Sequence, residues 1–127
     1  MNRITQMSLA LVAMFTCSLV FAQEKAHVNG VIIDQMCGEK CMKKDDPQKA
    51  AENHPKSCIA KCADSGYAVM AQGKLMKLDA SSNDKVKDFL ASAKSTQVVI
   101  DGTRSEDGTI TVDSITASDQ PTTKPSR

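Results

Sequence analysis

YAVMAQGKLMKL, residues 67–78, is the stretch that decides the fold of this chain. Two short runs, 67–71 and 74–78, flank Gln72 and Gly73. A two-residue link that contains glycine is typical of a tight turn between antiparallel strands. The sequence therefore predicts a β-hairpin at the centre of the chain, and the other elements can be placed outward from it.

Downstream of the hairpin, the pattern predicts one helix and a second pair of strands. Four apolar residues recur at positions i, i+3, i+4 and i+7 and so share one face of an amphipathic helix: Val86, Phe89, Leu90 and Ala93. Residues 97–101 and 109–113 are rich in β-branched residues and predict two strands. Gly102 and the turn at 106–108 are expected to link them.

Upstream of the hairpin, residues 27–34 predict a first strand, because they are rich in β-branched residues. Gly30 inside this strand indicates a bulge or a bend. A segment that contains four cysteines follows, at 37–66, and its composition favours helices. One more strand therefore precedes the hairpin, with helices between them.

Proline residues divide this helical segment. Asp46 followed by Pro47 favours a helix start, because the carboxylate caps the first turn and proline lacks only an N–H that the helix does not use. Pro55 predicts a break at His54 and a second helix, which is expected to end near Gly66. Two short helices are therefore expected between the first two strands.

The predicted order is strand, cysteine-rich helices, two strands, helix and two strands, which indicates a mostly β fold with helices (α+β). Five short strands with a helix between the third and the fourth follow the order of an OB-type barrel. We expect one OB-like domain over residues 23–117, with a helical insertion at 37–66 between strands one and two. A generic five-stranded α+β sheet is the competing interpretation.

The two ends of the chain differ from this domain. Residues 1–22 combine Arg3, an uncharged apolar run and a small residue at Ala22, which is the layout of a cleaved signal peptide. We therefore expect a secreted, periplasmic protein without a membrane association after cleavage. The polar, proline-bearing segment 118–127 is predicted to be a disordered tail.

Composition excludes several classes of function. The chain has 16 Lys and Arg against 15 Asp and Glu, a net charge of +1, so no basic excess is present to bind nucleic acid. It contains no serine nucleophile elbow, no H-E-x-x-H and no phosphate loop. The sequence therefore predicts a protein that is not an enzyme and binds an unknown ligand or protein.

The cysteines form two C-x3-C pairs, and in an exported chain an even number of them favours disulfides. Cysteines four apart share one helix face, so two antiparallel helices allow the pairings 37–62 and 41–58. The three possible connectivities of four cysteines remain open from sequence. Our first hypothesis is a small, non-catalytic binding or structural domain with two disulfides formed by Cys37, Cys41, Cys58 and Cys62.

The same segment allows two other functions. C-x3-C lies within the spacing of zinc sites, and an imidazole from His54 or His27 would complete a set of zinc or copper ligands. In this alternative the metal is held by Cys37, Cys41, His54, Cys58 and Cys62. The third alternative is a dithiol–disulfide redox protein, although the C-x-x-C spacing common among such proteins is missing.

The pattern Gly30-x-Ile32-x-Asp34-x-x-Cys37-Gly38, followed by His54-x3-Cys58-x3-Cys62-x3-Gly66-Tyr67, resembles an uncharacterised family of small secreted bacterial proteins. Gly73-Lys74 and a closing β-hairpin extend the resemblance over residues 27–117. The resemblance implies secretion and a compact β-rich domain with a cysteine-rich helical insertion. It implies no particular activity.

Overall fold

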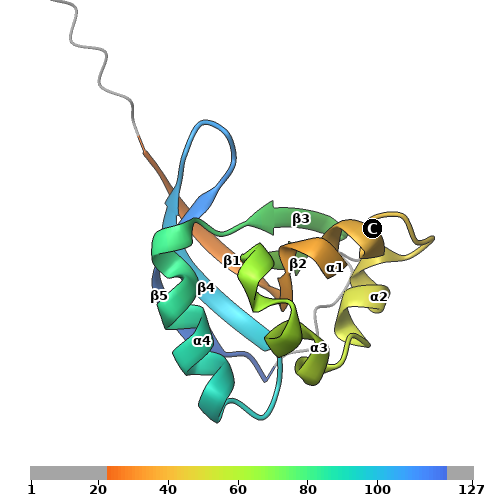
Figure 1. Cartoon of the computed structure of the whole chain (residues 1–127). Coiled ribbons are helices and arrows are strands. Elements are labelled where there is room, and N and C mark those ends of the chain that lie inside the picture. The colour runs from red at the N-terminus through yellow and green to blue at the C-terminus, as the bar shows by residue number, and fades with distance from the viewer. Residues whose placement is uncertain (1–22, 120–127) are drawn as a thin grey trace, which may run out of the picture.

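The computed structural model describes residues 23–119 and contains one five-stranded antiparallel sheet with helices on both sides (Figure 1). The strands lie in the order β3-β2-β1-β4-β5. Their bounds are β1 Glu24–Asp34, β2 Tyr67–Ala71, β3 Lys74–Lys77, β4 Gln97–Arg104 and β5 Ile110–Ala117. The helices are α1 Gln35–Cys41, α2 Pro47–Glu52, α3 Lys56–Lys61 and α4 Asn83–Ser92, with short 3-10 turns at Ala63–Ser65 and Ala80–Ser82. The α+β prediction, and the competing five-stranded sheet, are thus confirmed.

The sheet is not closed into a barrel, so this part of the OB-type prediction is wrong. β3 and β5 are the two outer strands. A single parallel bridge, Leu78 to Ile110, joins the residue after β3 to the start of β5, supported by a hydrogen bond from Asp79 N to Ile110 O of 2.9 Å. Within the described residues β3 and β5 share no ladder, so the sheet stays open between them.

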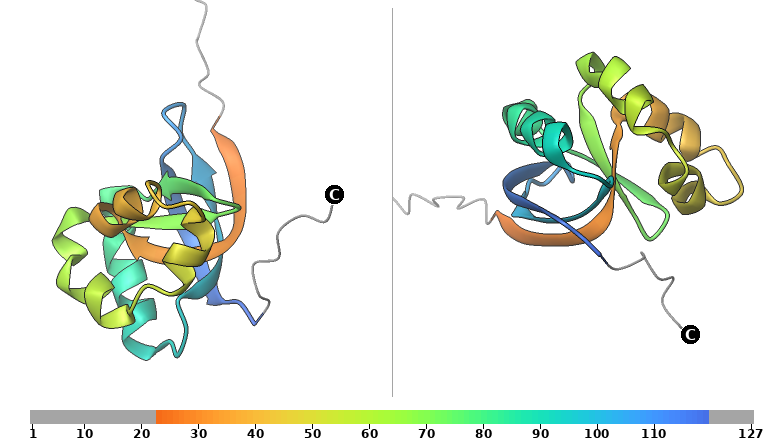
Figure 2. Two further views of the ribbon diagram at one scale, coloured as in Figure 1. Left: turned by 90° about the vertical axis from the view of Figure 1, so that its right-hand side faces the viewer. Right: turned by 90° about the horizontal axis from the view of Figure 1, so that it is seen from below.

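β1 holds the sheet together because it pairs with both halves. Its first part pairs with β4 up to Val31, and its last part pairs with β2 from Val31 onward. Gly30 lies just before this change of partner, and a Cβ at this position would lie 2.5 Å from Met70 O. The glycine therefore marks a close approach of two backbones in a strongly curved strand (Figure 2).

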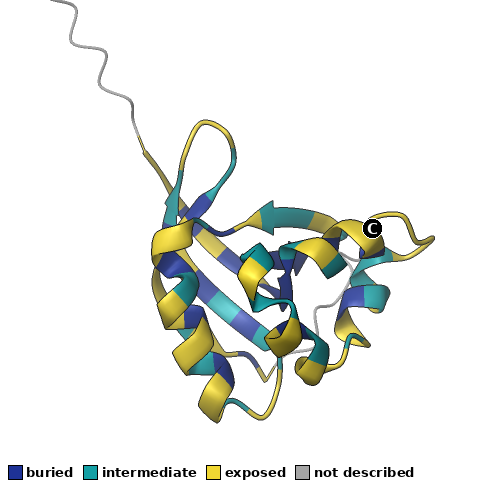
Figure 3. Cartoon of the chain, viewed as in Figure 1, coloured by how far each residue is buried: buried dark blue, intermediate teal, exposed yellow. Residues whose placement is uncertain are grey.

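The sheet carries apolar residues on both faces. On one face α4 and α3 cover a set of buried residues that we call the large core: Ala26, Val28, Ile32, Ile59, Tyr67, Val69, Ala71, Leu78, Val86, Leu90, Val98, Ile100, Ile110 and Val112. On the other face α1 and α2 cover a set that we call the small core: Val31, Ile33, Cys41, Ala51, Ala68 and Met70. β2 is buried along its whole length because both faces are covered (Figures 2 and 3).

The helix start at Asp46-Pro47 and the break at His54 are confirmed, but this segment contains three α-helices where two were expected. Asp46 caps α2, with its side chain accepting a hydrogen bond from Lys49 N, and the chain breaks at His54. The second helix is α3 with a 3-10 turn, and it ends at Gly66, whose φ of +85° is a conformation that glycine adopts readily. Both halves of this segment therefore pack as short units on the sheet.

Two turns between strands contain a glycine with a positive φ angle. Gln72 and Gly73 have φ of +52° and +75°, as a type I′ turn requires, so the central hairpin is confirmed. Gly102 was expected to lie in the link between the last two strands, but it lies inside β4, next to a register shift between Asp101 and Gly102. The real link is shorter than expected and turns at Gly108, whose φ is +85°.

The ends of the chain are described in part. Ser118, the first residue of the predicted tail, is buried and its N–H donates to Gln97 O, so the fold includes it. Residues 120–127, and the predicted signal peptide at 1–22, lie outside the described residues. Between residues 23 and 119, no helix is long and apolar enough to cross a membrane.

Candidate metal centre

Asp34 lies at the junction of β1 and α1 and has two separate roles there. It is the last residue of β1 and pairs with Tyr67 of β2. Its Oδ2 accepts a hydrogen bond of 2.8 Å from Cys37 N and so caps α1. The side chain is fully buried, and its second oxygen, Oδ1, has no hydrogen-bond partner. One oxygen therefore fixes the helix, while the other remains available.

His54 supplies the nearest group to that free oxygen. Its Nε2 lies 3.8 Å from Asp34 Oδ1, is buried, and has no hydrogen-bond partner. The residue stands between α2 and α3, where its N–H donates to Ala51 O. Because Pro55 follows, a helical conformation at His54 is disfavoured and the two helices stay separate. The break in the helices thus places an imidazole next to the end of β1.

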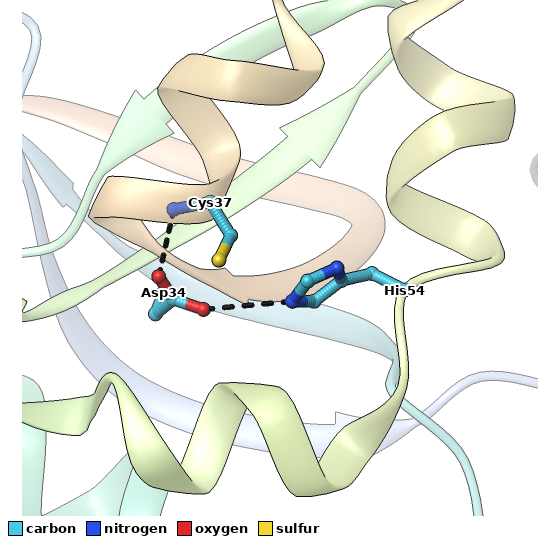
Figure 4. A group of neighbouring side chains, drawn as sticks. All are labelled: Asp34, Cys37 and His54. Atoms are coloured by element: carbon cyan, nitrogen blue, oxygen red, sulfur yellow. Dashed lines mark hydrogen bonds and ion pairs between the residues drawn. The ribbon is translucent and has the colours of Figure 1, made fainter.

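Cys37 completes the group from the first turn of α1. One ligand atom of each of Asp34, Cys37 and His54 lies within 4.8 Å of the others. Figure 4 shows the Cys37 sulfur pointing toward the space between the carboxylate and the imidazole. β1, the helix α1 that follows it directly, and the link after α2 therefore direct an oxygen, a sulfur and a nitrogen to one point.

The Cys37 thiol is protonated in this environment. Burial, followed by a hydrogen bond to the Asp34 carboxylate and the negative charge of that carboxylate, raises its pKa to about 11, and the neighbouring Cys62 thiol adds to the increase. A positive ion at this point would act in the opposite direction, because a coordinated thiol is deprotonated. The thiol can therefore exchange its proton for a metal.

Cys62 is a second thiol near Cys37. It follows α3 directly, and it adds to the raised pKa of the Cys37 thiol. Ser65 connects the two backbones, since its Oγ accepts from Met36 N and donates to Cys62 O at 3.3 and 2.8 Å. The start of α1 and the end of α3 are thus held side by side.

The other two cysteines lie apart from this group. Cys41 is buried in the small core, and burial, followed by the charge of Asp34, raises its pKa, although Lys44 lowers it. Cys58 is half-buried on α3. Of the five metal ligands predicted from sequence, the structure brings together Cys37 and His54, with Cys62 adjacent to Cys37. The cysteines of residues 23–119 carry free thiols.

His27, the other histidine considered as a ligand, lies elsewhere. It is on β1, its ring is largely exposed, and its Nδ1 is 2.5 Å from Asp101 Oδ1 on the paired strand β4. This is a cross-strand pair at the protein surface. His27 therefore takes no part in the group around Asp34.

The sequence reasoning missed Asp34 as a site residue. The signal was present, because an acidic residue ends an apolar strand, VIID, three residues before a cysteine. An aspartate at such a position caps the following helix, and capping by one oxygen leaves the other free. Its role depends on the packing of His54 against it, which residue spacing does not reveal.

No family model, curated protein or solved structure matches the chain. The chemistry of the site is therefore argued from its own atoms. A carboxylate oxygen, a thiolate sulfur and an imidazole nitrogen are the three kinds of protein ligand that Zn²⁺ uses. With bonds of about 2.0–2.2 Å to oxygen and nitrogen, tetrahedral Zn²⁺ separates these two ligand atoms by about 3.3–3.5 Å. Asp34 Oδ1 and His54 Nε2 are 3.8 Å apart, so a small approach of the two side chains would bring them to this separation.

Proposed function

We propose that the protein binds zinc and that Asp34, Cys37 and His54 hold the ion. The proposal is carried by two buried atoms, Asp34 Oδ1 and His54 Nε2, which face each other as a 3.8 Å ion pair and have no hydrogen-bond partner. A buried polar group without a partner costs about 1–3 kcal/mol, so a folded protein seldom leaves two of them together. A cation between them would satisfy both, and the Cys37 sulfur would provide a third ligand.

The ligand types favour zinc over copper. Cu(I) is selected by soft thiolate and thioether ligands, whereas Zn²⁺ accepts carboxylate, imidazole and thiolate together. Asp34 contributes a hard oxygen, and the exposed thioethers of Met36 and Met42 lie at the surface. Three protein ligands also leave a fourth coordination position for a water molecule or a bound group.

A nucleophilic function of Cys37 has less support. Catalytic cysteines have a lowered pKa, whereas the pKa of this thiol is raised to about 11. The Nε2 of His54 faces Asp34 Oδ1, and the Cys37 thiol hydrogen-bonds to the same carboxylate. Both groups therefore act on Asp34, rather than forming a chain in which the histidine activates the thiol.

The proposed role agrees with an OB-like arrangement of the chain. Five strands, α4 between β3 and β4, and the bridge from Leu78 to Ile110 support an open variant of that topology. In it, α1 to α3 form an insertion between β1 and β2, a loop that OB-folds use for ligands. From this topology and the signal peptide predicted at 1–22, we propose that the protein is exported to the periplasm and that its helical insertion binds the metal.

A second candidate function is a structural domain braced by disulfides. The proximity of Cys37 and Cys62, whose neighbouring backbones are joined through Ser65 Oγ, favours one of the two pairings expected from sequence. In the chain-entropy model, a disulfide that closes the loop between Cys37 and Cys62 stabilises the protein by about 3 kcal/mol. The same proximity gives no support to the pairing of Cys41, which packs in the small core.

Zinc titration of the full chain, kept reduced by a phosphine and monitored with a competing chromophoric chelator, tests the proposal. We expect about one zinc ion per chain, as for a mononuclear site. Removal of a ligand in His54→Asn or Cys37→Ser should weaken affinity by at least about a hundredfold, since even changes around ligands cost 10–100-fold.

The chain offers matched controls for both variants. His27→Asn removes its other histidine, which lies at the surface, and Cys58→Ser removes a half-buried thiol of α3. Both should bind zinc as tightly as the unaltered chain. Equal losses in His27→Asn and His54→Asn, or no zinc uptake by the reduced chain, would refute the proposed site.

A further inference from the structure

Cys37 belongs to two arrangements at once. Its sulfur faces Asp34 and His54 in the candidate metal centre, and the Cys62 thiol lies close enough to raise the pKa of Cys37. A sulfur atom that forms a disulfide is no longer a thiolate and is lost as a zinc ligand. The two arrangements therefore exclude each other chemically, although they are adjacent in space.

The backbone holds the two thiols in place for bond formation. Gln35 N donates to Gly66 O at 2.9 Å, and Ser65 Oγ bonds both Met36 N and Cys62 O. These contacts fix the residues that flank Cys37 on α1 and Cys62 on α3. A disulfide requires the two sulfur atoms to lie about 2.05 Å apart. When the backbones are adjacent, rotation of the two side chains can bring the sulfur atoms to this distance.

We propose that oxidation joins Cys37 to Cys62 and thereby expels the zinc ion, so that the metal centre is open only in the reduced protein. This regulation rests on the zinc-binding function proposed above. Cys41, enclosed in the small core, and Cys58, one turn earlier on α3, are spectators.

The oxidant is a low-molecular-weight or protein disulfide, and the step balances with it. The thiolate of Cys62 attacks the external disulfide, one thiol leaves, and the sulfur of Cys37 then displaces the second thiol. Cys37 and Cys62 lose two electrons in total and form one S–S bond, and the external disulfide gains them as two thiols. Of the two protons that these leaving thiols carry, one comes from Cys62 and one from solvent, and the zinc ion passes to the chelator.

The experiment follows zinc and disulfide together in the zinc-loaded full chain. Oxidised glutathione is added in the presence of a chromophoric chelator that reports free zinc. Samples are alkylated at intervals and digested with trypsin. Each cysteine of the described residues then lies in a peptide of its own: 26–40, 41–43, 57–61 and 62–74.

We expect zinc to be released in step with the appearance of peptide 26–40 linked to 62–74, and to rebind after reduction. In Cys62→Ser, release should be at least about tenfold slower, because the thiol that attacks the external disulfide first is missing. Cys58→Ser should behave like the unaltered chain in both readouts. A phosphine-treated sample provides the baseline.

The proposal fails in three distinguishable ways. If the linked peptides form while zinc stays bound, or if Cys62→Ser releases zinc at the unaltered rate, oxidation of this pair does not control the metal. If zinc binds but the oxidant links other peptides, the pairing is wrong and zinc binding stands. If the reduced chain takes up no zinc, the proposed function fails, and the regulation fails with it.

Discussion

The two faces of the sheet differ in what they bury. The large core contains fourteen residues and no carboxylate, histidine or cysteine. The small core contains six, including Cys41, and Cys37 packs against it beside Asp34. Ile32 and Ile33, neighbours on β1, point to opposite faces, since successive strand residues alternate. One strand therefore serves a purely apolar layer and a layer that adjoins polar chemistry.

The difference shows how a small domain separates stability from chemistry. Apolar burial stabilises by about 25 cal/mol per Å², so the larger set supplies most of the hydrophobic stabilisation. The smaller face can then accommodate a buried carboxylate and an imidazole with unpaired atoms, which reduce stability. Each prediction below changes one face, and the first two measure zinc affinity as well as stability.

The largest effect on stability is expected from Ile100→Ala, in the middle of β4. Ile100 is fully buried in the large core, and its truncation leaves a cavity. Such substitutions cost about 2–5 kcal/mol, to be measured by urea unfolding of the metal-free chain. Zinc affinity of the folded variant should stay unchanged. A large loss of affinity would mean that the two faces are coupled.

Asp34→Asn should have the opposite effect to Ile100→Ala: zinc affinity should fall while stability is kept. Asparagine still caps α1 through its carbonyl oxygen, and its amide can donate to His54 Nε2, so the unpaired atoms gain a partner. The stability of the metal-free chain should change by less than about 1 kcal/mol, or rise. Zinc affinity should fall by about a hundredfold or more, because the anionic ligand is lost. A marked loss of stability would contradict the division between the faces.

The smallest effect concerns a carboxylate on the side of the large core. Desolvation raises the pKa of Asp79, but hydrogen bonds from Ser82, Ser81 and Thr111 outweigh it and lower the pKa below its ordinary 3.8. A lowered pKa means that the stabilisation is present above about pH 4 and is lost as the pH falls through the folded value.

Asp79→Asn measures this contribution. At pH 7 the variant should lose about 1 kcal/mol of unfolding free energy, as for other capping and turn side chains. Between pH 5 and pH 3 the unaltered chain should lose about 1 kcal/mol more than the variant, because only the unaltered chain has this carboxylate to protonate. Urea unfolding at several pH values provides the comparison. Parallel pH profiles would show that the paired carboxylate is not a source of acid sensitivity.

Most elements of the fold could be predicted from sequence because their signals are local. Gln72-Gly73 requires a turn, Asp46-Pro47 starts a helix, and Gly66 ends one. Closure into a barrel could not be predicted in this way. It depends on pairing between β3 and β5, which are far apart in sequence and, in the described residues, meet through a single bridge and no ladder.

The candidate site was predictable only in part. The cysteine spacing identified Cys37 and Cys62, and Pro55 placed His54 at a helix break. Spacing treated the four cysteines as equivalent, however, whereas packing encloses Cys41 in the small core and brings Cys62 to Cys37. Asp34 was missed because its second oxygen acquires its role only when α2 folds back over the sheet.

The division of the Asp34 carboxylate between its two oxygens has a consequence for observation. Oδ2 holds the amide proton of Cys37, while Oδ1 faces the proposed ion. Charge drawn toward a metal by one oxygen is withdrawn from the other, so the capping hydrogen bond weakens slightly when the site fills. The amide resonance of Cys37 is therefore a built-in probe that should shift on metal loading without any attached label.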